Sequence, residues 1–160
     1  MSRDSDAFVE RMGAALTQAG LPRVPSLVFS ALLIDDDGRM TAAELAEGLE
    51  VSAASVSSAV NYLARLGMLR RERERGSRRD VYVVDDDAWH GTLMRTDQLY
   101  APMLAALSEG LDVLGEDSRA HQRLLLTREF LSFVDAEMAT LAQKWDQRRA
   151  EINAGRARER

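Results

Sequence analysis

Two capped helices separated by a very short link constrain the fold of this chain more than any other feature. Thr41-Ala-Ala-Glu44 has the spacing of a capping box, in which both side chains accept hydrogen bonds from free amides at a helix start. Ser52 is placed to cap a second helix that runs to about Leu66, and Gly67 is placed to end it. Only three or four residues separate the two helices, which is typical of a helix-turn-helix.

The second helix has one apolar side and one polar side. The residues predicted to face the core are Val56, Ala59, Val60, Leu63 and Leu66. The opposite side is small and polar, as a helix that enters the roughly 12 Å wide major groove of DNA requires. The predicted DNA-facing residues are Ala53, Ala54, Ser55, Ser57, Ser58, Asn61, Tyr62 and Arg65. Serine hydroxyls donate to phosphates or base edges, an asparagine amide reads adenine, and a tyrosine contacts phosphate or the thymine methyl.

A basic β-hairpin is predicted to follow the second helix. Residues 68–73 and 79–84 alternate as strands do, and Gly76-Ser77 lies in the link between them. Residues 51–80 hold seven arginines and three acidic residues, a net charge of +4, whereas the other 130 residues sum to −9 and the chain to −5. Such a patch is typical of a surface that binds a polyanion, and arginines favour the narrow minor groove. The candidate wing residues are Arg73, Arg75, Ser77, Arg78 and Arg79, with Arg75 and Arg78 flanking the tip.

The first 50 residues are predicted to supply helices that support this motif. A helix over 5–19 would turn its apolar side inward, and Gly20 would end it. Residues 26–34 read as a helix rather than a buried strand, because a proline precedes them and they do not alternate. A turn over 35–38 and a very short strand at Arg39-Met40 would lead into the capped helix. The inward residues of the first helix are predicted to be Phe8, Met12, Ala15, Leu16 and Ala19.

The last 70 residues are predicted to form two long helices. The first would begin near Ala88 and contain Pro102, which should kink it, and the second would begin after a break at Gly115 to Ser118. Apolar residues recur at steps of four and three in both helices, which is a seam that needs a partner helix. The candidate dimerisation residues are Phe8, Met12, Leu107, Leu131, Val134, Met138, Leu141 and Trp145. The predicted organisation is therefore a DNA-binding domain over 1–85, a helical dimerisation region over 86–152 and a frayed tail over 153–160.

Four aromatic residues near these seams raise the hypothesis of an effector pocket: Trp89, Tyr100, Phe130 and Phe133. Aromatics at helical spacing are more often plain core, so the core interpretation is favoured.

Several classes of function are excluded by what the sequence lacks. It has no cysteine, no phosphate loop, no nucleophile elbow and no zinc-protease motif, so we expect neither an enzyme nor a bound cofactor. The acidic runs at 35–37 and 85–87 fit turns and caps, and His90 and His121 stand far apart, so no metal site is expected. No apolar run is long enough to span a membrane and the N-terminus does not resemble a secretory signal, which indicates a cytoplasmic protein.

The stretch from Phe8 to Val84 resembles the winged helix-turn-helix of MarR-type regulators, and more closely their GbsR-like branch. The matching segments are FVERMGAALTQAGLPRVPSLVFSALL, MTAAELAEGLEVSAASVSSAVNYLARLGMLRR and GSRRDVYVVDDDAW. This resemblance implies a homodimer, held by its terminal helices, on a pseudo-palindromic operator with half-sites about one helical turn apart. It also implies that Ser52 to Leu66 is the recognition helix, that Arg78 or Arg79 is the wing arginine, and that a small molecule controls binding, as in many members.

The sequence thus predicts a mainly α fold with a small β-hairpin wing, a winged helix-turn-helix followed by long C-terminal dimerisation helices. The predicted function is a transcriptional regulator that binds double-stranded DNA as a homodimer. The alternative is a winged-helix module that binds protein and not DNA, and the basic patch beside the capped helices favours DNA. Since Arg65 is the single basic residue of the recognition helix, affinity should rest mainly on wing and phosphate contacts.

Overall fold

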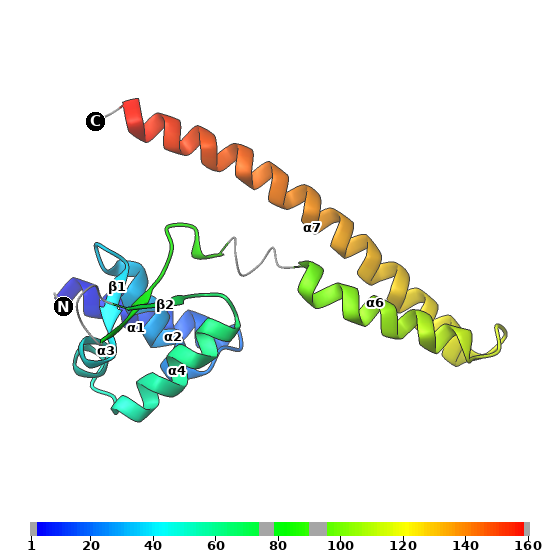
Figure 1. The fold of residues 1–160 in the computed structure, drawn as a ribbon, viewed down its shortest axis with the longest axis horizontal. Helices are drawn as coiled ribbons and strands as arrows, with labels where there is room; N and C mark the ends of the chain where they lie inside the picture. The colour runs from blue at the N-terminus through cyan, green and yellow to red at the C-terminus, as the bar shows by residue number, and fades with distance from the viewer. Residues whose placement is uncertain (1–2, 74–78, 90–95, 159–160) are drawn as a thin grey trace. The chain divides into compact units, whose positions relative to one another are not determined.

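A computed structural model describes residues 3–73, 79–89 and 96–158 of the chain (Figure 1). The chain divides into two compact units, Met1–Thr92 and Leu93–Arg160. The first unit holds four helices and a three-stranded sheet among its described residues, and the second holds two long helices. The predicted class, mainly α with a small β-sheet wing, is confirmed.

Helix α2 (Arg23–Ile34) is the centre of the first unit. Its residues from Pro25 to Leu32 are all buried, which confirms the prediction of a helix that is apolar almost all round. Helix α1 (Arg3–Gln18) packs along it, as Figure 1 shows. The predicted inward side of α1 is wrong in part. The helix buries Val9, Gly13 and Leu16 against the core. Of the other predicted residues, Phe8 and Met12 are half-buried, whereas Ala15 and Ala19 are exposed.

The helix-turn-helix has the caps that the sequence predicts. Strand β1 (Arg39–Thr41) leads into α3 (Ala42–Gly48), where the Glu44 amide donates to Thr41 Oγ1 over 3.2 Å and the Thr41 amide donates to Glu44 Oε2 over 2.7 Å. Helix α4 (Ala53–Arg65) begins with the Ser55 amide donating to Ser52 Oγ over 3.1 Å. Both caps are confirmed, and they fix where each helix starts.

One predicted core residue of α4 is wrong. Val56, Ala59, Val60 and Leu63 are buried, but Leu66 is 40% exposed. The helix ends at Arg65, and Gly67 turns the chain with a positive φ of 71°. The two residues after this turn, Met68 and Leu69, are buried in the core.

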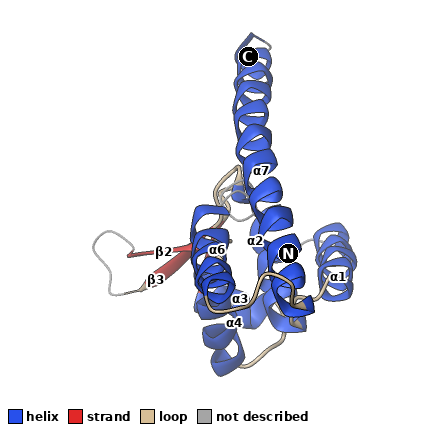
Figure 2. Ribbon diagram, turned by 90° about the vertical axis from the view of Figure 1, so that its right-hand side faces the viewer, coloured by secondary structure: helices blue, strands red, loops and turns tan. Residues whose placement is uncertain are grey.

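The wing is the outer part of a small antiparallel sheet with strand order β1-β3-β2. Strands β2 (Arg70–Arg73) and β3 (Asp80–Val83) pair directly, with Arg71 opposite Tyr82 and Arg73 opposite Asp80 (Figure 2). Both strands are confirmed, with ends slightly inside the predicted ranges. The predicted tip over 74–78, which includes Arg75, Ser77 and Arg78, lies outside the described residues.

The chain after β3 is anchored on the core by an aromatic contact. Ala88 and Trp89 are helical, but the rest of the predicted helix up to residue 95 lies outside the described residues, and α6 begins at Thr96. The Trp89 ring meets the buried Phe29 ring edge-on, with centroids 5.3 Å apart. This contact accounts for one of the four aromatics considered for an effector pocket, because it places Trp89 on the core of the first unit.

The second unit is a helical hairpin. Helices α6 (Thr96–Asp112) and α7 (Arg119–Arg158) lie side by side, joined by residues 113–118, which confirms the predicted break. The two helices approach closely at Gly110 of α6, where a Cβ atom would lie 2.7 Å from Leu124 Cδ2. Pro102 lies within α6, and α7 continues to Arg158, past residue 153 where fraying was expected. In the described ranges, no helix is both long and apolar enough to cross a membrane.

Candidate DNA-binding surface

Helix α4 exposes most of the residues that the sequence predicts to face DNA. Because α4 packs its apolar side on the core, its opposite side is open to solvent. The exposed members of the predicted set are Ala53, Ala54, Ser57, Ser58, Asn61 and Arg65. The structure therefore brings six of the eight predicted residues onto one open helix face.

The two remaining residues of α4 have structural partners. Ser55 is half-buried, and its hydroxyl lies 2.8 Å from the Ser52 hydroxyl inside the cap. Tyr62 is half-buried and packs against the hydrophobic core. Their side chains hold α4 in place as well as bordering the exposed face.

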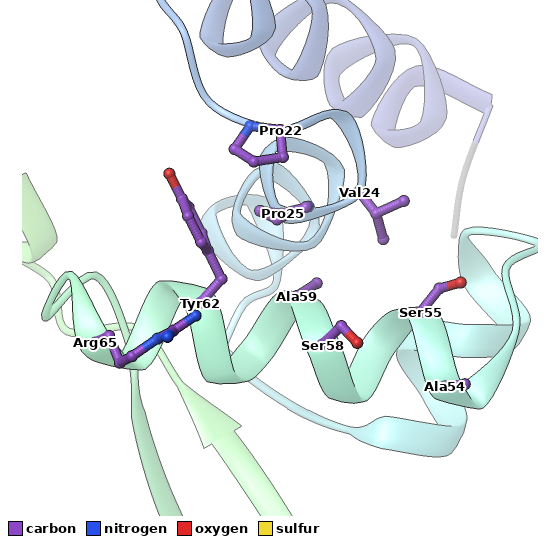
Figure 3. Close-up of a pocket in the computed structure, with 9 residues that line it drawn as sticks. All are labelled: Pro22, Val24, Pro25, Ala54, Ser55, Ser58, Ala59, Tyr62 and Arg65. Atoms are coloured by element: carbon purple, nitrogen blue, oxygen red, sulfur yellow. The ribbon is translucent and has the colours of Figure 1, made fainter.

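An open groove runs beside α4 and is shared with the start of α2. Figure 3 shows the Tyr62 ring reaching from α4 toward Pro22, and Ala59 pointing toward Pro25. Ser58 and Arg65 line the same groove from α4. The sequence analysis missed Pro22, Val24 and Pro25 as part of this surface, since helical periodicity considers one helix at a time. The two prolines before the apolar run were the available signal.

A second shallow hollow lies on the outer side of α4 and is lined by Ser58, Asn61, Ala64 and Arg65. It brings the candidate base-reading amide of Asn61 close to the positive charge of Arg65. Because both lie on the last two turns of α4, the end of the helix combines a group that reads bases with one that binds phosphate.

The arginines of the wing strands are not equivalent. Arg70 donates from Nε to Asp85 Oδ1 over 3.0 Å and also pairs with Glu72, and Arg71 pairs with Asp80. Arg39 of β1 reaches the same Glu72 at 3.2 Å. The base of the wing therefore contains ion pairs that the sequence-level net charge of +4 does not reveal.

The Arg71–Asp80 pair also affects protonation. The hydrogen bond from Arg71, followed by its charge, holds the pKa of Asp80 below its usual range, and the same hydrogen bond raises the pKa of Arg71. Asp80 is therefore ionised throughout the neutral range, and its negative charge lies beside Arg71.

Two predicted arginines lack such a partner in the described part of the chain. No ion pair joins Arg65 or Arg73 to another residue within 3–73, 79–89 and 96–158. Arg79 stands just before β3 and contributes to lowering the pKa of Glu44, so its charge lies near the start of α3. Arg65 and Arg73 thus have no ion pair among the described residues, although the charge of Arg73 also contributes to lowering the pKa of Asp80, which stands opposite it.

The candidate dimerisation and effector residues are distributed over both units. Four of the candidate dimerisation residues are half-buried in the hairpin: Leu107, Leu131, Val134 and Met138. Two others on α7, Leu141 and Trp145, are exposed. The last two, Phe8 and Met12, are half-buried in the first unit. Phe130 and Phe133 are each 62% exposed and Tyr100 is half-buried, and all three belong to the second unit. Trp89 belongs to the first, so no single unit brings the four candidate effector residues together.

Comparison with known proteins relates both units to one family. A model described as MarR family matches residues 19–80, and a model described as MmpR5-like MarR family transcriptional regulator matches residues 87–148. The chain is 25% identical over 145 residues to the HTH-type transcriptional regulator MmpR5 of Mycobacterium tuberculosis, covering 90% of this chain and 88% of that protein. A crystal structure of a transcriptional regulator, 24% identical in sequence, has the same fold, with a TM-score of 0.79 over 90% of this chain and 99% of that chain. MarR-family models thus match the winged helix-turn-helix and the helical hairpin separately, which relates both units of this chain to the MarR family of winged-helix transcriptional regulators.

Proposed function

We propose that this protein is a sequence-specific transcriptional regulator that binds double-stranded DNA as a homodimer. The observation that carries the proposal is the exposed face of α4, which combines small side chains with Asn61 and Arg65 on a helix capped at Ser52 and held by the core. Helices with this character dock in the major groove, and MarR-family regulators bind DNA. Similarity to this family therefore supports the same role for α4 here.

In the proposed complex, α4 lies in the major groove and the wing follows the adjacent minor groove. Asn61 would read a base edge, while Arg65 and Arg73 would contact phosphates from either side. The tip arginines Arg75 and Arg78, together with Arg79, would enter the minor groove, whose narrow form attracts arginine. A net charge of −9 on the rest of the chain opposes non-specific wrapping of DNA around the protein.

The homodimer is supported by an apolar surface on α7. Leu126, Phe130 and Phe133 recur at the four- and three-residue spacing of one helix face, and their exposures are 74%, 62% and 62%. Leu141 and Trp145 continue exposed apolar surface toward the C-terminal half of the helix. We name these five residues the α7 stripe. An exposed apolar surface of this length on a helix is typical of a protein–protein contact.

A second copy of the same chain is the proposed occupant of the α7 stripe. The other side of α7 is already used, because Leu124 meets Gly110 and half-buried residues follow from it at helical spacing as α7 runs along α6. A dimer formed through terminal helices would present two copies of α4 to two half-sites of a pseudo-palindromic operator, about one helical turn apart.

Two finer parts of the proposal rest on the sequence resemblance alone. Assignment to the GbsR-like branch is supported by the three matching segments quoted above. Modulation by a small molecule is supported by its occurrence in many members of the family that the sequence resembles. Modulation by a small molecule is tested with aromatic ligands and with cationic osmolytes. The thermal unfolding temperature and the operator affinity are both measured in their presence. If none shifts either quantity, we would withdraw the proposal of an effector.

DNA binding is tested by fluorescence anisotropy with the purified full-length protein. One labelled duplex spans the region upstream of the protein's own gene, the other is its scrambled counterpart, and both are titrated at several salt concentrations. We expect tighter binding to the upstream duplex and an affinity that falls steeply with salt. Absence of binding to either duplex at low salt would instead favour a winged-helix module that binds protein. Equal binding to both would contradict sequence specificity.

A further inference from the structure

The base of the wing contains as many acidic as basic side chains in contact. Strand side chains alternate between two faces, and each face has its own ion pairs. On one face Glu72 joins Arg39 and Arg70, and Arg70 also reaches Asp85, while on the other face Asp80 joins Arg71. We name these six residues the wing-base cluster: Arg39, Arg70, Arg71, Glu72, Asp80 and Asp85.

The strand register explains why these partners meet. Arg70 and Arg39 both stand opposite Val83, on either side of β3, and Glu72 stands opposite Val81, so all three project to the same face. Arg71 stands opposite Tyr82 and Arg73 stands opposite Asp80, which places Asp80 diagonal to Arg71 on the other face. The pairs therefore follow from the sheet, and they require no unusual side-chain arrangement.

We propose that the wing-base cluster contributes no net electrostatic attraction to DNA. Its three carboxylates would thereby limit the non-specific affinity of the wing for DNA. This inference rests on the proposed function. Within the described sheet, it assigns contact with phosphate to Arg73, which lies outside the cluster. Arg70 and Arg71 are not expected to contact phosphate, although the sequence alone counts all three arginines as one basic patch.

The physical reason lies in the exchange of charges on binding. DNA affinity gains when a cation displaces counterions from a phosphate. An arginine that keeps its carboxylate partner brings no net charge to the phosphate. If the arginine leaves that partner, an ionised carboxylate remains near the DNA and repels it. In both cases the arginine adds little to the free energy of DNA binding. This holds although exposed ion pairs contribute little to folding stability.

Asp80 is the best position at which to test the cluster. Its side chain is 28% exposed and its partner Arg71 is 58% exposed, so Asp80→Asn leaves room for the new amide and releases the arginine. The comparison set is Arg71→Gln, the double variant of both changes, and Arg73→Gln. Glu10→Gln, on the exposed side of α1, is the charge-matched control for removing one negative charge elsewhere.

The measurement is anisotropy with a duplex of random sequence over a series of salt concentrations, using full-length protein whose fold is checked by circular dichroism. We expect Asp80→Asn to bind several-fold more tightly than wild type at low salt, with a salt slope steeper by about one per protomer. Arg71→Gln should bind more weakly than wild type, because it leaves the Asp80 carboxylate without its arginine. The double variant should return to wild-type values, and Arg73→Gln should lower the slope by about one.

Two results would overturn the inference while leaving the proposed function intact. One is a double variant whose slope falls as far as that of Arg73→Gln, which would show that Arg71 contacts phosphate, because the double variant leaves the net charge unchanged. The other is an Asp80→Asn variant that behaves like Glu10→Gln. Absence of salt-dependent binding by wild type and every variant would overturn the proposed function, and the inference with it.

Discussion

At the scale of single residues, α4 separates side chains that hold the helix from side chains that are free to contact a ligand. Ser55 and Tyr62 are engaged with the cap and the core, whereas Asn61 and Arg65 are exposed. Amide groups discriminate between bases and guanidinium groups bind any phosphate, so these two exposed residues should affect binding in different ways.

We predict that Asn61→Ala changes sequence preference more than overall affinity. Loss of a bidentate contact to adenine should cost about 1–3 kcal/mol at one operator position and leave non-specific binding unchanged. The measurement is a panel of operator duplexes with single base-pair changes. Arg65→Gln is the matched comparison and should weaken every duplex to a similar extent. A uniform weakening by Asn61→Ala would contradict its assignment to base recognition.

The turn between α3 and α4 contains a residue whose substitution by glycine should stabilise the folded state. Glu50 has a φ of 53°, in the left-handed region that costs an L-residue about 1–2 kcal/mol. We predict that Glu50→Gly raises the free energy of unfolding by about 0.5–1 kcal/mol, after the entropic cost of a new glycine. Glu47→Gly, within helix α3, should lower it by a similar amount. Urea unfolding followed by circular dichroism compares them, and equal destabilisation by both would contradict the argument.

At the scale of elements, capping groups decide where the two helices of the motif begin. Ser52 satisfies a free amide at the start of α4, the helix that is proposed to enter the groove. We predict that Ser52→Ala lowers the free energy of unfolding by about 1 kcal/mol and weakens operator binding, because the first turn of α4 frays. Ser57→Ala, on the exposed face of the same helix, is the control and should leave stability within about 0.5 kcal/mol. Equal stability of both variants would contradict a capping role.

The capping box of α3 should make stability depend on pH. Hydrogen bonds from the Thr41 amide and hydroxyl lower the pKa of Glu44 in the folded state, with a smaller contribution from the charge of Arg79. Since the folded pKa lies below the unfolded one, this contribution is present above the usual glutamate range and is lost as the pH falls through the folded pKa. We predict that the stability difference between wild type and Glu44→Ala narrows as the pH falls from 6 toward about 3. A difference that stays constant with pH would exclude the carboxylate as its source.

At the scale of the whole molecule, the first unit is built on its own core and the second on a helical hairpin, and the proposed regulatory function requires a second copy. The first unit carries the helix-turn-helix, and the second carries the α7 stripe, in which Leu126, Phe130 and Phe133 are each more than half exposed. The proposed dimer joins these two properties, because two copies of α4 would read two half-sites.

We predict that Phe130→Glu combined with Phe133→Glu converts the protein to monomers. Buried charges without partners are strongly unfavourable in an apolar interface, and both rings lie in the α7 stripe. Analytical ultracentrifugation measures the mass, and operator affinity should fall with it. Ser132→Glu, exposed on another side of α7, is the control and should remain dimeric. A dimer in the double variant would exclude the stripe as the interface.

The sequence by itself determined the local structure of this protein. The capping box at Thr41, the cap at Ser52 and the turn at Gly67 act through neighbouring backbone groups, so a few adjacent residues specify them. Hydrophobic periodicity likewise predicts the buried side of α4 and the presence of two long helices near the C-terminus, because the spacing that defines a helix face is local.

Only the tertiary structure decided which side chains meet across elements. The wing-base cluster depends on the register of three strands, the groove beside α4 depends on the start of α2, and the buried side of α1 depends on how closely it packs against α2. A net charge of +4 summed along the chain does not show that Asp80 lies against Arg71. The same holds for Phe130 and Phe133, whose exposure depends on which side of α7 is packed against α6. These contacts join residues distant along the chain, so no local pattern encodes them, and packing between elements selects them.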